Sequence, residues 1–124
     1  MLLIDTNIVI ASHRHADNWA KEFVRGHDVC CSVIIKVETL GFARIEDFER
    51  ANLAAFLAAI DLLPVDDAVI EYAIVLRQRR NMGLGDALIA GTALVHGLEL
   101  ITRNIDDFRW IDELVVFNPY PDHR

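Results

Sequence analysis

Four segments that lie far apart in the sequence carry acidic side chains of the kind that bind a divalent cation. They contain Asp5, Glu38, Asp86 and the adjacent pair Asp106 and Asp107. Taken singly, each acid has an ordinary structural explanation, because aspartates cap helices and occupy turns. If the acids lie close together in the fold, they indicate a binding site, since unrelated helix caps have no reason to meet. A cluster of carboxylates needs a counter-charge, because like charges raise one another's pKa.

The cation that such a cluster selects is a hard one. Carboxylate oxygens favour Mg²⁺ or Mn²⁺, and no spacing of histidines and cysteines in the chain resembles a zinc site. Ions of this kind orient a water molecule, lower its pKa and stabilise the charge that builds on a phosphate. His13 and His15 are candidates for contact with a substrate, although a surface role is the simpler explanation. The acids therefore predict metal-assisted chemistry on a phosphoester.

Apolar periodicity predicts the elements that would bring these acids together. The expected strands are residues 2–4, 28–32, 62–65, 98–102 and 114–117. The expected helices begin near Ile8, Asp17, Ser32, Asp47, Asp66 or Asp67, and Asp86. Strands that alternate with helices are typical of βαβ units. The predicted fold class is therefore α/β, a three-layer α/β/α sandwich with a mainly parallel sheet of about five strands.

The same periodicity predicts which helix faces are buried. The expected buried residues are Val33, Val37, Leu40 and Gly41, then Phe48, Leu53, Phe56 and Leu57, then Val69, Tyr72, Ala73 and Leu76. Glu38 lies between Val37 and Leu40, so its carboxylate is expected near a packed face. A charge there is costly unless it is paired or bound to a cation. Pro64 predicts an edge position for the third strand.

Sheet topology predicts where the acids meet, because ligands of an open parallel sheet lie outside the carboxyl ends of the strands. Asp5 directly follows the first strand, and Asn104 and Asp107 lie just beyond the fourth. Asp86 is expected in the first turn of a helix antiparallel to that fourth strand. Glu38 is expected about 9 Å along its own helix, and its long side chain reaches back toward the same edge.

Composition favours one globular domain that spans residues 1–124. Hydrophobic residues make up 53% of the chain. No secretory signal is expected, because Asp5 interrupts the apolar start and no basic segment precedes it. Cys30 and Cys31 are adjacent and point to opposite faces of a strand, so we expect free thiols in the reducing cytoplasm.

The net charge of −7 argues against binding of nucleic acid through bulk positive charge. The chain has 19 acidic residues against 12 lysines and arginines. Proteins that hold a phosphate backbone by charge usually carry a basic face. Cations bound among four acids would offset much of the excess locally, so the charge fits a metal-centred site.

Five sequence blocks resemble those of the PIN-domain family, especially the toxin ribonucleases of VapBC-type toxin–antitoxin pairs. The blocks are residues 3–7 (LIDTN), 37–41 (VETLG), 84–90 (LGDALIA), 101–108 (ITRNIDDF) and 116–119 (VFNP). They occur in the family's order and cover the chain from end to end. The resemblance implies a parallel sheet flanked by helices, a Mg²⁺ or Mn²⁺ site and cleavage of single-stranded RNA. It also implies a cognate antitoxin, a homodimer and hetero-oligomers with the antitoxin.

The resemblance assigns the core catalytic and metal-binding positions to Asp5, Glu38 and Asp86. By the same carry-over, Thr6 and Asn7 fix the first loop, and Thr102 orients a ligand or a water molecule. The fourth acid varies: some members have an aspartate where this chain has Asn104, and others use the one before the phenylalanine, here Asp107. We expect Asp107 to complete the catalytic and metal-binding set, with Asn104 as a supporting group and Asp106 outside it.

The helices that carry Trp19 and Phe23, and Phe48 and Phe56, hold more large apolar residues than a small core needs. Ordinary core packing explains at least half of them. The others predict an apolar groove for an amphipathic antitoxin segment. The resemblance suggests that such a segment also presents a basic side chain to the acids.

Three other functions compete with this interpretation. A haloacid-dehalogenase-like phosphatase needs a second acid two residues after the first, where this chain has Asn7. A phospho-acceptor receiver domain needs a lysine at its last strand, but the lysines of this chain are Lys21 and Lys36. A non-catalytic binding module with the same fold remains open, because a fold alone does not establish a function.

Overall fold

The computed structural model describes residues 1–13 and 18–120, in which strands and helices alternate. The strands are β1 (Leu2–Ile4), β2 (Val29–Ser32), β3 (Asp61–Leu63), β4 (Glu99–Ile101) and β5 (Val116–Phe117). The α-helices are α1 (Thr6–Ser12), α2 (Asn18–Gly26), α3 (Ile34–Leu40), α4 (Asp47–Ala59), α5 (Asp67–Arg79) and α6 (Leu84–His96), and a 3₁₀ turn, η1 (Ile105–Asp107), follows β4. Each predicted strand is present, and in these ranges no helix has both the length and the apolarity to cross a membrane.

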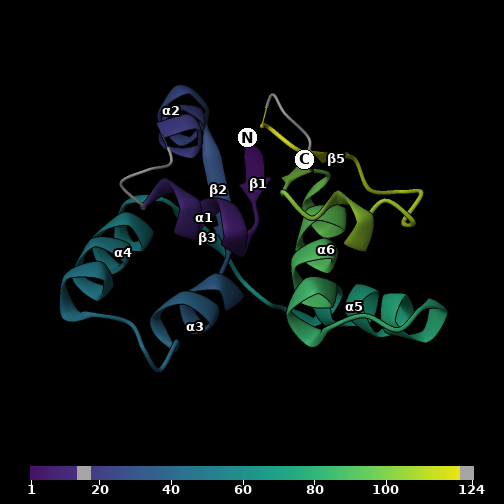
Figure 1. The fold of residues 1–124 in the computed structure, drawn as a ribbon. Helices are drawn as coiled ribbons and strands as arrows, with labels where there is room; N and C mark the ends of the chain where they lie inside the picture. Colours follow the sequence, from purple (N-terminus) through teal and green to yellow (C-terminus); the bar gives the residue numbers. More distant parts are fainter. Residues whose placement is uncertain (14–17, 121–124) are drawn as a thin grey trace.

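The five strands form one parallel sheet in the order β3-β2-β1-β4-β5. From β1 the chain moves to β2 and β3 in one direction, then crosses back to β4 on the other side of β1. Right-handed crossovers therefore place α1 to α4 on one face and α5 and α6 on the other. Figure 1 shows α1, α2 and α4 on one side of the strands and α5 and α6 on the opposite side. The predicted α/β sandwich is confirmed, and β3 is an edge strand as Pro64 indicated.

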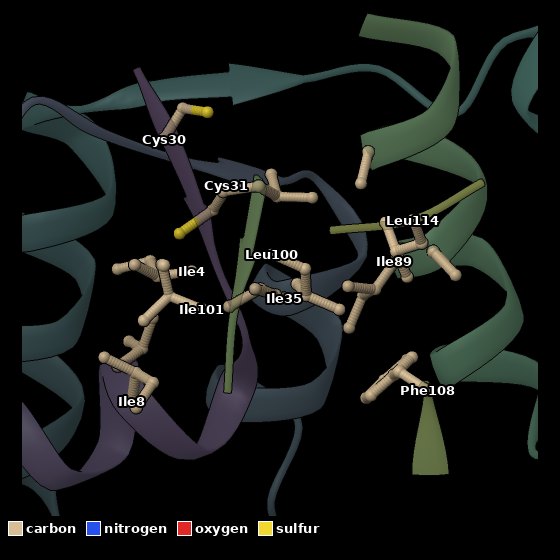
Figure 2. Close-up of a cluster of buried hydrophobic side chains, with 14 of the residues drawn as sticks. Ile4, Ile8, Cys30, Cys31, Ile35, Ile89, Leu100, Ile101, Phe108 and Leu114 are labelled. Carbon is tan, nitrogen blue, oxygen red and sulfur yellow. The ribbon is translucent and has the colours of Figure 1, made fainter. Parts of the chain in front are cut away.

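The hydrophobic core lies on both faces of the sheet, because strand side chains alternate between them. Figure 2 shows Ile4 and Ile8 on one side of the strands and Ile89 and Leu114 on the other. Cys30 and Cys31 point in different directions from β2, and both are buried free thiols. Burial raises the pKa of Cys30 to about 11, so this thiol is unreactive at neutral pH.

The position of α6 is set by its C-terminal cap and by close packing against α5. Because the helix is rigid, the position of its first turn is set as well. Gly97, with φ of 62°, ends the helix in a left-handed conformation that favours glycine. Gly91 faces α5, and a Cβ there would lie 2.9 Å from the carbonyl oxygen of Val69. Asp66 caps the start of α5, because its Oδ1 accepts a hydrogen bond from the Val69 backbone N–H at 3.0 Å. The two helices therefore pack closely.

Four of the residues predicted to be buried on helix faces are exposed, and one of them, Gly41, is the residue that follows α3. Val37 is 67% exposed, Phe48 is 71% exposed and Tyr72 is 46% exposed. Helix α3 has only seven residues and buries Ile35 and Thr39, which lie on the opposite side from Val37. A stripe of two residues is too short for periodicity to determine its phase.

Two predicted helix caps have different outcomes. Helix α3 begins one residue later than expected, with Val33 at the cap position. Ser32 is buried at the end of β2, and its Oγ accepts a hydrogen bond of 3.4 Å from the Ile34 backbone N–H. The predicted cap Asp17 lies outside the described residues.

Candidate active site

Asp5 lies between the carboxyl ends of β1 and β4, where the strand order reverses: the connections from β1 lead toward β2 and β3, whereas β4 lies on the other side of β1. Because Ile4 is paired with Ile101, the residues that follow them, Asp5 and Thr102, lie side by side. Asp5 is only 4% exposed and is the cap residue of α1. Its Oδ1 accepts a hydrogen bond from the Thr6 backbone N–H at 2.7 Å, and its Oδ2 accepts one from Thr102 Oγ1 at 2.8 Å. These two bonds fix the orientation of the carboxylate.

Asn7 connects the start of α1 to the loop after β4. Its Nδ2 donates to Thr102 Oγ1 at 3.2 Å and to Asp5 Oδ2 at 3.4 Å. Its Oδ1 accepts a hydrogen bond from the Arg103 backbone N–H at 3.3 Å. Thr102 Oγ1 also accepts a hydrogen bond from the Asn104 backbone N–H at 3.0 Å. Asn7 and Thr102 therefore form a polar network under the Asp5 carboxylate.

Glu38 reaches the same edge of the sheet from α3. Thr6 Oγ1 donates a hydrogen bond of 2.8 Å to Glu38 Oε1, which connects α1 with α3. The carboxylate lies against Gly85 in the first turn of α6, where an added Cβ would collide with Oε2 and lie 3.2 Å from Cδ. Glu38 is exposed, so the expectation of a carboxylate beside a packed face is wrong. Its position depends on the contacts with Thr6 and Gly85 instead.

Asp86 faces the other acids from the first turn of α6. Burial, and then the negative charges of Asp5, Asp107 and Glu38, raise its pKa to about 6. The pKa of Asp5 is also raised, mainly by burial and further by Glu38 and Asp107, against the lowering effect of its hydrogen bonds with Thr102 and Thr6. The structure thus brings four acids from separate segments to one edge of the sheet.

The two aspartates of η1 differ in their surroundings. The charge of Asp107 contributes to the raised pKa of both Asp5 and Asp86. Asp106 forms an ion pair with Arg109 at 2.8 Å, and its side chain is 80% exposed. Asn104 precedes the turn, and it lines a cavity of about 460 Å³ together with both aspartates.

The donor set of this site suits a hard divalent cation. It consists of carboxylate oxygens from four elements, the ligands that Mg²⁺ and Mn²⁺ prefer. In the described ranges, no three acidic, histidine or cysteine side chains are close enough to form a finished metal cage. Burial is the main cause of the raised pKa values of Asp5 and Asp86, and the neighbouring carboxylates raise them further, so a cation bound here would offset the repulsion among these acids.

The histidines that were considered for substrate contact are not assigned to the site. The His13 ring is 2.9 Å from the carbonyl oxygen of Val9 and packs edge-on against Phe56. His15 lies outside the described residues.

Sequence reasoning missed the role of Gly85. This glycine gives the Glu38 carboxylate room to lie beside Asp86. The available signal was its place next to Asp86 in the block at residues 84–90. That signal does not reveal which side chain occupies the space above the glycine.

The chain is similar to known proteins over its whole length. The PIN-domain family description, "PIN domain", matches residues 2–114. Ribonuclease VapC10 of Mycobacterium tuberculosis is 31% identical, over 100% of this chain and 98% of that protein. Ribonuclease VapC1 of Rickettsia felis is 30% identical, over 93% of each chain.

Among solved structures, a toxin–antitoxin complex from Klebsiella pneumoniae contains a similar chain. It superposes with a TM-score of 0.82 at 30% identity, over 97% of this chain and 98% of that one. The match to the family description, the full-length relatives and the shared fold establish that the chain belongs to the PIN-domain family.

Proposed function

We propose that this chain is a Mg²⁺- or Mn²⁺-dependent endoribonuclease and the toxin of a toxin–antitoxin pair. The observation that carries the proposal is the meeting of Asp5, Glu38, Asp86 and Asp107 at the carboxyl ends of β1 and β4. The relatives support the substrate class, because two of them are named ribonucleases and are similar over nearly their full length.

The residues divide into metal ligands and groups that position them. Asp5, Glu38, Asp86 and Asp107 hold the cation, which when bound supplies activation of water and neutralisation of charge on the phosphate. Thr102 and Asn7 hold the carboxylate of Asp5 in one orientation. Thr6 holds Glu38, so that two ligands are fixed before an ion binds. Such preorganisation is what makes an active site effective.

The direct test is to free the protein of any partner and incubate it with total cellular RNA and Mg²⁺ or Mn²⁺. New RNA ends are then mapped by sequencing. Asp5→Asn, Glu38→Gln and Asp86→Asn should each lower cleavage by orders of magnitude while the fold remains intact. Intact RNA in the presence of the folded wild-type protein and metal would favour the non-catalytic binding module.

We further propose that the antitoxin binds beside Glu38. A cavity of about 190 Å³ between α1, α3 and α4 is lined by Ile10, Glu38, Thr39, Phe42, Ile45, Glu49 and Leu53. Phe42, which lines this cavity, is 59% exposed, and Phe48, on α4, is 71% exposed. An amphipathic segment with a basic residue fits this combination of exposed apolar rings and carboxylates. Trp19 is a weaker candidate, because its Nε1 donates to the carbonyl oxygen of Pro119.

Co-expression with the partner tests this placement. Phe48→Glu should weaken the complex, whereas Val115→Glu, at an exposed apolar residue just before β5 and outside both α4 and α5, serves as the matched control for an antitoxin contact. A basic side chain among the acids would occupy the place of the cation, so metal should not stabilise the complex. A complex in which the partner contacts neither α4 nor the edge near Asp5 would contradict the placement.

The predicted homodimer also has structural support. Helix α5 exposes Ile70, Tyr72, Ile74 and Val75, each by 40–46%. These exposed apolar side chains around the solvent side of α5 fit an interface between two copies. We propose that the dimer uses helix α5, and that the protein acts in the cytoplasm, where its free thiols Cys30 and Cys31 stay reduced.

A further inference from the structure

A polar cavity of about 460 Å³ adjoins the acidic centre on the side of β4. Its lining comes from the loop after β4, from η1 and from the segment after β5: Arg103, Asn104, Ile105, Asp106, Asp107, Arg109 and Asn118. The volume is within the range of roughly 300–1,000 Å³ that is usual for small-ligand sites. Asp107 belongs both to this lining and to the acids that act on Asp5 and Asp86. A ligand in the cavity would therefore lie next to the reacting phosphate.

The cationic groups of this cavity are not equivalent. Arg109 is paired with Asp106 at 2.8 Å. Arg103 has no carboxylate partner among residues 1–13 and 18–120, and its guanidinium lies 4.3 Å from the centre of the Tyr120 ring. Stacking uses the face of the guanidinium and leaves the in-plane N–H groups to point at an anion. The backbone of Arg103 is held as well, because its N–H donates to Asn7 Oδ1.

Two amide side chains complete the lining. Asn104 and Asn118 bring donors and acceptors of the kind that bind the edge of a base. Asn118 Oδ1 accepts a hydrogen bond from the Tyr120 backbone N–H at 3.0 Å, which fixes the segment that carries the stacked ring. An arginine for a phosphate and amides for a base edge are the groups by which proteins bind single-stranded RNA.

We propose that this cavity is a nucleotide-binding subsite of the active site. Arg103 binds the phosphate next to the scissile one, and Asn104 and Asn118 bind the edge of the adjacent base. In a chain with a net charge of −7, the subsite supplies one positioned cation for a phosphate beside the acidic centre. The inference rests on the proposed ribonuclease function for its choice of ligand.

Binding is measured on the Asp86→Asn protein, so that the RNA is not cut. The probe is a fluorescent single-stranded RNA that contains the mapped cleavage site, or a mixed-sequence RNA if no site is found. Arg103→Gln should weaken binding about tenfold, because it removes a charge-assisted contact. It should also reduce the slope of log affinity against log salt by about 0.7, the value for one phosphate contact on a single strand.

The matched control is Arg25→Gln. Arg25 lies near the C-terminus of α2, just before β2, and so at the amino ends of the strands, away from the carboxyl ends where the acids meet. Arg25 is exposed, and its replacement should change neither the affinity nor the salt slope. Tyr120→Leu removes the ring beside Arg103 and should weaken binding. Melting temperatures establish that each variant is folded.

In the active enzyme, Arg103→Gln should raise KM more than it lowers kcat, and Asn104→Ala should relax the sequence preference next to the cut. Equal effects of Arg103→Gln and Arg25→Gln, or an unchanged salt slope, would overturn the subsite. If no RNA is cleaved by the wild type but binding still depends on Arg103, the proposed catalysis fails while the subsite stands.

Discussion

The Thr102 hydroxyl donates a hydrogen bond of 2.8 Å to Asp5 Oδ2 and joins the ends of β1 and β4 across 97 residues of sequence. The same oxygen accepts hydrogen bonds from Asn7 and from the Asn104 backbone N–H. Asp5 is therefore held by a residue that is itself held from two sides. This network makes Thr102 a positioning residue for the acid that is most deeply buried.

Thr102→Val should raise the pKa of Asp5 further, because the bond from Thr102 lowers it. The acid limb of the cleavage profile should then move to higher pH, and the protein should lose on the order of 1–3 kcal/mol of stability as buried polar groups lose their partner. Thr102→Ser keeps the hydroxyl and should retain both the profile and most of the stability. Matching profiles for the valine and serine variants would contradict this role.

Asp86→Asn should stabilise the metal-free protein at neutral pH. The folded state raises the pKa of Asp86 from 3.8 to about 6, so the folded protein binds a proton more tightly than the unfolded chain does. The contribution of Asp86 to stability is therefore greatest below about pH 4, falls as pH rises to about 6 and stays low above it. After solvent screening of this half-buried group, the loss is about 1 kcal/mol.

Thermal unfolding between pH 4 and 8 without metal measures this effect. The wild type should melt lower as pH rises through this window, and Asp86→Asn should show a smaller change. Asp67→Asn, at the exposed start of α5, is a control for the loss of one negative charge. An identical pH dependence in the wild type and Asp86→Asn would exclude the predicted coupling.

Gly85→Ala should impair catalysis without unfolding the protein. The added Cβ displaces the end of the Glu38 side chain, which is flexible, so the fold tolerates the change. Alanine also has a higher helix propensity than glycine, by about 1 kcal/mol. Gly83→Ala is the control, because nothing lies within 4 Å of a Cβ at that position. Cleavage rates and melting temperatures of both variants test the prediction, which fails if both are equally active.

Asp107→Asn should reduce cleavage more than Asp106→Asn. The charge of Asp107 acts on Asp5 and Asp86, whereas Asp106 is occupied by Arg109. Initial rates at several Mn²⁺ concentrations should show a higher metal requirement for the Asp107 variant alone. A larger defect in Asp106→Asn would contradict this prediction and show that the fourth acid is Asp106.

The sequence predicted the positions that follow directly from strand order. Asp5 was placed because it follows β1 at the carboxyl edge of a parallel sheet, and Asp86 because α6 runs antiparallel to β4. These inferences need only the alternation of elements and the general rule for parallel sheets. Their success depends on topology rather than on the details of side-chain packing.

The contacts of Glu38 could not be predicted from the sequence. Its neighbours Val37 and Leu40 suggested a packed face, but α3 buries Ile35 and Thr39 instead. The carboxylate is placed by Thr6, 32 residues away, and by the missing side chain of Gly85. Interactions between distant segments of this kind depend on tertiary packing, which local patterns do not encode.

A metal site among these carboxylates is tested most directly by RNA cleavage by the partner-free protein, measured after EDTA treatment and again after Mg²⁺ or Mn²⁺ is added back. EDTA should abolish cleavage, and either ion should restore it. The ion should also raise the melting temperature of the wild type by mass action, but not that of a protein with both Asp5→Asn and Asp86→Asn. Cleavage that survives complete chelation, or that persists in the doubly substituted protein, would contradict a metal site among these carboxylates.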